Sequence, residues 1–143
     1  MLQRVALLSA ATLAGILFVA APALAETGLE PSPAQVEFGQ VDIHFGGSPR
    51  QSVKFTNSFP TPVTVFSVAV SGPDAQRFQI TNDSCSGQTV SMGPDSCPVE
   101  VSFEPGTPGL KGATLELFTS EGTLAAPLSG EGVTGTLAAS PSR

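Results

Sequence analysis

Prolines interrupt this chain so often that long helices are excluded over most of its length. Twelve of the 13 prolines follow residue 30, at positions 31, 33, 49, 60, 62, 73, 94, 98, 105, 108, 127 and 141. Proline lacks a backbone N–H and clashes with the preceding helical turn, so few windows remain in which a helix could form. The sequence after residue 30 is therefore expected to fold from short strands joined by turns.

The runs between these turns alternate apolar and polar residues with a period of two, which indicates strands with one buried face. In the clearest run, Val99, Val101 and Phe103 alternate with Glu100 and Ser102. Further strands are expected at 36–43 with a break near Gly39, 51–56, 62–70 with a change of face near Phe66, 78–80, 90–92, 115–117 and 124–128. Four phenylalanines are spaced as core residues from different strands: Phe38, Phe55, Phe78 and Phe103.

Seven or eight half-buried strands at this spacing predict an all-β fold, an immunoglobulin-like antiparallel β-sandwich. Two sheets that are each apolar on one face bury those faces against one another. An up-and-down barrel is the alternative, although it usually requires more regular strand lengths. One domain is expected at 34–133, preceded by a linker at 26–33 and followed by a disordered tail at 134–143.

The first 25 residues have the order of a secretory signal peptide. Arg4 is followed by an apolar run at 5–20, and Ala23 and Ala25 form a small-residue cleavage site. A signal-peptide helix with cleavage after Ala25 is expected. The alternative is an uncleaved anchor, but the run is shorter than the roughly 20 residues of a membrane-spanning helix. The mature chain is expected in the periplasm or outside the cell, without stable membrane insertion.

The charge balance excludes one broad class of partner. Six basic residues stand against 12 acidic ones, whereas a nucleic-acid binder needs clustered lysine and arginine to neutralise phosphates. Cleavage after Ala25 would remove Arg4 and leave five basic against 12 acidic residues, a net charge of −7. No nucleic-acid partner is therefore expected.

Cys85 and Cys97 are the only two cysteines. An even count in an exported chain argues for a disulfide, here closing a short polar loop before the strand at 99–103. A redox-active pair is the alternative, but such pairs usually have two intervening residues at a helix N-terminus. A structural bridge is predicted.

Residues for metal or catalytic chemistry are scarce. His44 is the sole histidine, too few for a blue-copper site, which needs two histidines and a thiolate. It is expected to be a surface residue. Asp74, Asp83 and Asp95 lie in expected loops, but no calcium-loop spacing connects them. No metal, cofactor or catalytic residue is predicted.

Several short motifs cover about 34–133. They are, in order, Val36-Glu37-Phe38-Gly39-Gln40-Val41, Phe55-Thr56-Asn57, Ser71-Gly72 with Phe78, Cys85 with Cys97, Val101-Ser102-Phe103-Glu104-Pro105, 109–117 and Leu128-Ser129-Gly130-Glu131-Gly132-Val133. Together they resemble the bacterial choice-of-anchor D domain, which is related to the abnormal-spindle/hydin (ASH) immunoglobulin-like folds. The turn after Asn57, Ser58-Phe59-Pro60, departs from the family pattern. The resemblance implies a binding or structural module of the cell envelope.

Taken together, these features predict an exported, non-catalytic module that binds an unknown protein or glycan of the envelope. Edge strands, the loop Phe45-Gly46-Gly47 and Phe59 are the candidate contacts. The alternative is a small secreted enzyme or metal carrier with an unrecognised carboxylate site. A pilus-type chaperone is disfavoured because it needs two such domains.

Overall fold

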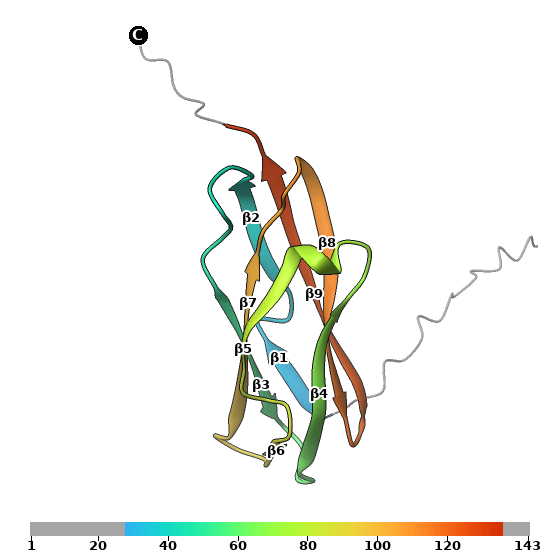
Figure 1. The fold of residues 1–143 in the computed structure, drawn as a ribbon. Helices are drawn as coiled ribbons and strands as arrows, with labels where there is room; N and C mark the ends of the chain where they lie inside the picture. Colours follow the sequence, from blue (N-terminus) through green and yellow to red (C-terminus); the bar gives the residue numbers. More distant parts are fainter. Residues whose placement is uncertain (1–27, 136–143) are drawn as a thin grey trace, which may run out of the picture.

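The structure is a computed structural model that describes residues 28–135. Two β-sheets pack face to face (Figure 1), one with strand order β1-β3-β7-β5 and the other β2-β9-β8-β4-β6. The elements are β1 (Leu29–Ser32), β2 (Val36–Asp42), β3 (Gln51–Asn57), β4 (Val63–Ser71), the 3-10 turn η1 (Ala75–Arg77), β5 (Phe78–Asp83), β6 (Thr89–Val90), β7 (Ser96–Phe103), β8 (Gly109–Thr119) and β9 (Gly122–Val133). This part of the chain contains no helix with the length and hydropathy of a membrane span.

The architecture confirms the predicted all-β, immunoglobulin-like sandwich. The expected signal peptide at 1–25, with its cleavage residues Ala23 and Ala25, lies outside the described residues, as does the expected tail from 136 onward. The single domain predicted at 34–133 corresponds to the sandwich without its first strand.

The alternation in sequence sets which face of each strand is buried. On β7, Val99, Val101 and Phe103 are buried, and on the facing sheet Leu115 and Leu117 of β8 are fully buried. Two rows of apolar side chains thus meet between the sheets and exclude water from the centre of the domain.

The four phenylalanines predicted as core residues do pack into the core. Phe55, Phe78 and Phe103 are buried, and Phe38 packs against them half-buried. The Phe78 and Phe103 rings stack with centroids 4.7 Å apart, and Phe38 lies 5.6 Å from Phe103. This aromatic cluster joins β2, β5 and β7, which come from both sheets.

The expected change of face near Phe66 is a β-bulge. The pairing of β4 with β8 shifts between Val65 and Ser67, which leaves Phe66 as the extra residue. The Phe66 side chain is 63% exposed. The bulge allows Val63 and Val65 before it, and Val68 and Val70 after it, to contact the core.

The linker predicted at 26–33 is corrected by strand β1. Residues Leu29–Ser32 pair antiparallel with β3, and Leu29 is buried. The sequence pattern missed this strand because Leu29 is its only large apolar residue and Pro31 lies within it. Proline is compatible with this position because β1 is an edge strand and needs ladder hydrogen bonds on one side only.

One strand pair departs from the predicted antiparallel arrangement. β2 runs parallel to β9, with Val36 opposite Leu128 and Asp42 opposite Val133. The register shifts between Glu37 and Gln40, where Gly39 adopts a φ of 68°. The predicted break near Gly39 is therefore confirmed as a bulge, and a left-handed residue there favours glycine.

Candidate interaction surface

The predicted disulfide is present. Cys85 and Cys97 are joined, their Cα atoms lie 4.9 Å apart, and both side chains are buried. The bond ties the loop after β5 to the start of β7. The same loop pairs with β4 through backbone bonds from Gly87 to Val65 and from Val65 to Gln88. The disulfide thus fastens β6 and its loop to the end of the sandwich, which is a structural role.

Asp83 organises the loop that carries Cys85. Its Oδ1 accepts hydrogen bonds from the backbone N–H groups of Cys85 and Ser86, and its Oδ2 accepts one from the Ser86 hydroxyl. Partial burial raises the pKa of Asp83, but these hydrogen bonds together outweigh it and hold the pKa below its usual value. Asp83 therefore stabilises the loop as a carboxylate.

His44 lies where the sequence predicted it, on the surface. It follows β2, its side chain is 67% exposed, and its Nδ1 lies 3.1 Å from Asp42 Oδ1. The His44 backbone N–H donates to the same oxygen at 2.8 Å, and this hydrogen bond lowers the pKa of Asp42. Asp42 therefore holds the turn that presents the next residue, Phe45.

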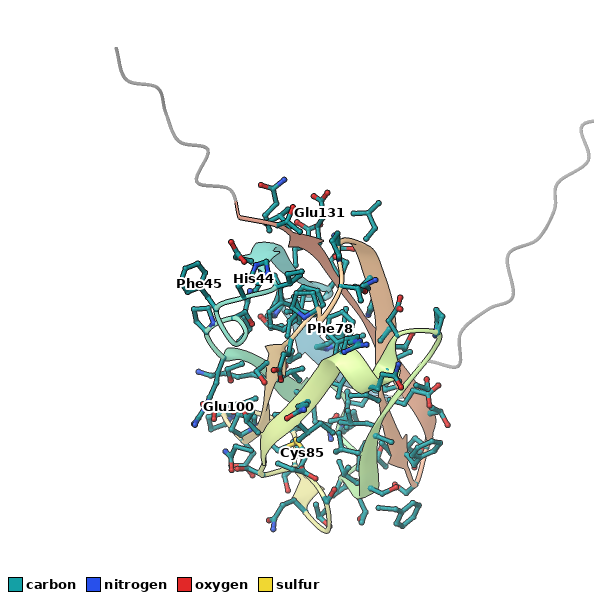
Figure 2. The ribbon with its side chains drawn as sticks, turned by 45° about the horizontal axis from the view of Figure 1, so that its top comes forward. His44, Phe45, Phe78, Cys85, Glu100 and Glu131 are labelled. Carbon is teal, nitrogen blue, oxygen red and sulfur yellow. A yellow bond between two sulfur atoms is a disulfide. The ribbon has the colours of Figure 1, made fainter. Side chains whose placement is uncertain are left out.

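Phe45 projects from this turn into solvent. Its side chain is 80% exposed, and Figure 2 shows it beside His44 at the end of the molecule that also carries Glu131. Cys85 lies away from that end. An isolated exposed side chain of this size is ordinary by itself, but a second exposed apolar residue lies toward the same end of the sandwich, where β8 starts beside the end of β9. That residue is Leu110, at the start of β8, which is 82% exposed.

Leu110 borders a groove on the outer face of the five-stranded sheet. The groove has a volume of about 340 Å³ and is lined from β2, β8 and β9 by Glu37, Gly39, Gln40, Leu110, Lys111, Ser129, Gly130 and Glu131. Gln40 Nε2 donates to Glu131 Oε2 at 3.2 Å across the parallel pair β2–β9. The sequence did not reveal this groove, because it depends on the parallel pairing and the Gly39 bulge.

The three loop carboxylates considered for calcium are not brought together. Asp74 Oδ2 accepts the Gly112 N–H on β8, Asp83 holds the Cys85 loop, and Asp95 lines a separate polar hollow with Ser84, Gln88 and Thr89. Within residues 28–135 no three histidine, cysteine or acidic side chains are grouped closely enough to hold a metal.

Phe59, the other predicted contact, is only partly available. Its ring lies against Gly28, where an added Cβ would come within 2.7 Å of the ring, and 38% of the side chain is exposed. Phe59 therefore covers the chain at the start of β1, and only part of its side chain is accessible to a partner.

The comparisons with known proteins bear on the fold. No protein-family model and no curated protein matches this sequence. Among solved structures, the secreted serine protease VesC from Vibrio cholerae is 24% identical over 67% of this chain and 21% of its own, with a TM-score of 0.54. An ASH/PapD-like domain of human CEP192 is 16% identical over 76% of this chain and 87% of its own, with a TM-score of 0.51.

A second Vibrio cholerae protease, VesB, matches with 22% identity over 75% of this chain and 32% of its own, with a TM-score of 0.50. This chain thus spans no more than about a third of either protease, but most of the CEP192 domain. At these identities the likeness establishes the fold. The chain has an immunoglobulin-like β-sandwich fold similar to that of the ASH/PapD-like domain, and its activity and partners do not follow from the likeness.

Proposed function

We propose that the protein is an exported, non-catalytic module of the choice-of-anchor D type that binds a protein or glycan of the bacterial envelope, in the periplasm or outside the cell. The signal-like sequence at 1–25 and the Cys85–Cys97 disulfide support export, because disulfides persist in oxidising compartments. The motifs at 34–133 and the ASH-like fold support a module rather than a complete enzyme.

The observation that carries the binding role is the surface at the end of the sandwich where β2 and β9 finish. Leu110 lines the groove that Gln40 and Glu131 span, and Phe45 protrudes from the turn that follows β2 at the same end. Exposed apolar anchors beside hydrogen-bonding groups are the composition of recognition surfaces. We call this surface, made by Phe45, Leu110 and the groove, the Phe45 end.

One observation favours the enzymatic alternative: two carboxylates, Glu37 and Glu131, line the same groove. Each accepts a hydrogen bond from a neighbouring glutamine amide, Glu37 from Gln35 and Glu131 from Gln40. Glu37 is exposed and Glu131 half-buried, whereas a catalytic carboxylate is usually activated by burial. We therefore assign the pair to recognition. A screen for hydrolysis in which E37Q and E131Q each abolished turnover would reverse this assignment.

The proposal is tested by comparing retention of envelope material on immobilised wild-type protein and on the double variant F45A/L110A. Both side chains are exposed, so the fold should persist. We expect retention to fall about tenfold or more, as for loss of interface anchors. Protease or periodate treatment of the extract would show whether the retained component is protein or glycan.

Met92→Ala is the matched control. Met92 is also an exposed apolar side chain, 56% exposed, but it bridges to Asn57 at the opposite end of β3 from the Phe45 turn. Retention by M92A should equal that of wild type. Equal retention by F45A/L110A and wild type would place the binding surface elsewhere.

A further inference from the structure

Most edges of the two sheets are protected against pairing with another strand. β1 is short and contains Pro31, and β5 carries a bulge between Ile80 and Asn82. On β2 the carbonyl of Glu37 is occupied by Gln51 Nε2 at 2.8 Å, next to the Gly39 bulge. Prolines, bulges and capped carbonyls are the usual means by which proteins blunt sheet edges.

The edge of β4 is different. β6 pairs only with Val63 and Thr64, and its loop only with Val65, so neither reaches the rest of β4 (Figure 1). Residues 66–71 contain no proline and no charged residue. Val68 and Val70 face the core but are only half-buried, whereas Leu115 and Leu117, opposite them on β8, are fully buried. The difference in burial marks an open side of the sheet.

The sequence of this open edge reads the same in both directions. Ser67-Val68-Ala69-Val70-Ser71 is a palindrome centred on Ala69. If two copies of β4 pair antiparallel with their two-fold axis at Ala69, serine meets serine, valine meets valine and alanine meets alanine. Residues directly opposite in a sheet lie on the same face, so the valines continue the core, and Ser67, Ala69 and Ser71 continue the outer face.

We propose that β4 is the interface for a second copy of this chain, which joins the five-stranded sheets of two sandwiches into one continuous sheet. The edge carries no charge, so an otherwise acidic chain meets itself here without repulsion across the strands.

The chain turns away from the ladder of β4 and β8 after Ser71. Asp74 is bound to Gly112 through its backbone and its carboxylate, and the chain then crosses by η1 to β5 in the other sheet. The Ala75 N–H bonds to the Gly72 carbonyl and η1 packs beside β4, so the pairing that we propose is limited to Ser67–Ser71. The arrangement is isologous and closes as a dimer.

The test is the molecular mass in solution of the purified, disulfide-bonded protein, measured by sedimentation from about 1 to 500 μM, the range in which small interfaces associate. We expect a monomer–dimer equilibrium. Ala69→Lys places two lysines opposite each other at the axis and should raise the dissociation constant about tenfold or more.

Ala125→Lys is the matched control, because Ala69, Glu116 and Ala125 lie in one row across the outer face of the sheet. Each lysine is placed next to Glu116, but only that at 69 lies on the β4 edge. A125K should dimerise like wild type. A monomer throughout the concentration range, or a dimer that A69K and A125K affect equally, would overturn the proposal.

A second variant gives an answer if A69K does not fold. Ala69→Cys should form a disulfide between the introduced thiols of two copies on mild oxidation, identified by peptide mass, and A125C should not. A folded A69C protein that remains uncrosslinked at concentrations where wild type is a dimer would contradict pairing at Ala69. A monomer that instead binds an unrelated extended peptide at this edge would assign the edge to a different partner and refute the proposal.

Discussion

Gly130 on β9 has no space for a side chain. A Cβ built there would lie 2.4 Å from Cε1 of Phe103, within the aromatic cluster. Gly112, on the neighbouring strand β8, has its nearest such contact at 4.0 Å. The two glycines therefore differ in the packing they allow, although both lie within strands of one sheet.

Gly130→Ala is expected to destabilise the protein by about 1–3 kcal/mol, because the added methyl overpacks the core around Phe103. Gly112→Ala should be neutral or stabilising by up to about 1 kcal/mol, because it restricts the unfolded chain without a clash. Urea unfolding monitored by circular dichroism measures both. Equal stabilities for the two variants would show that Phe103 moves aside freely.

The buried side chain of Asn57 makes hydrogen bonds that could not be predicted from the motif in which it lies. The side chain donates to the carbonyls of Thr61 and Val90 at 2.7 and 2.9 Å and accepts from the Phe59 N–H. One amide thus fixes the unusual turn at 58–61 and joins it to β6. The sequence showed that Ser58-Phe59-Pro60 departs from the pattern of the family that the chain resembles. The hydrogen bond from Asn57 to Val90, however, joins residues 33 positions apart and depends on the tertiary fold.

Among the elements, the loop between β5 and β7 depends on the disulfide. Reduction, or the double substitution C85A/C97A, is expected to cost about 3 kcal/mol, because the unfolded chain regains the freedom of the closed loop. The melting temperature should fall by about 10 °C or more. An unchanged melting temperature, with both thiols free by mass spectrometry, would mean that the bond does not stabilise the fold.

The same loop should give the domain a sensitivity to acid. The folded-state pKa of Asp83 lies below its usual value of 3.8, so its contribution is fully present above that pH and is lost as pH falls through the folded pKa. Asp83→Asn should be less stable than wild type at neutral pH, and the difference should shrink below about pH 4. Unfolding at neutral pH and at about pH 3 measures this, and a difference that does not change with pH would exclude the carboxylate as the cause.

The elements that the sequence identified are those with strict alternation, such as β7 and β8, since their burial is decided residue by residue. β1 was missed because its place depends on pairing with β3 rather than on an apolar face. The parallel pair β2–β9 was missed because alternation does not encode the direction of a neighbouring strand. The groove depends on both β2 and β9, so it was inaccessible to sequence reasoning, although the exposed loop at Phe45 was predicted as a contact.

Across the whole molecule, the two proposed surfaces are compatible. The Phe45 end lies over β2, β9 and the start of β8, whereas the open edge belongs to β4, on the opposite side of the same sheet. A dimer formed through β4 would leave both Phe45 ends free. Two copies of a weak recognition surface in one particle would bind a repetitive envelope structure more tightly than one copy does.

Hydrogen–deuterium exchange of the protein, alone and saturated with the envelope component that it retains, locates the binding surface. We expect protection at 39–47, 108–112 and 129–132, which form the Phe45 end, and unchanged exchange at 57–62 and 86–92 at the opposite end. Protection confined to the opposite end, or turnover of the bound component in place of a stable complex, would contradict the proposed function.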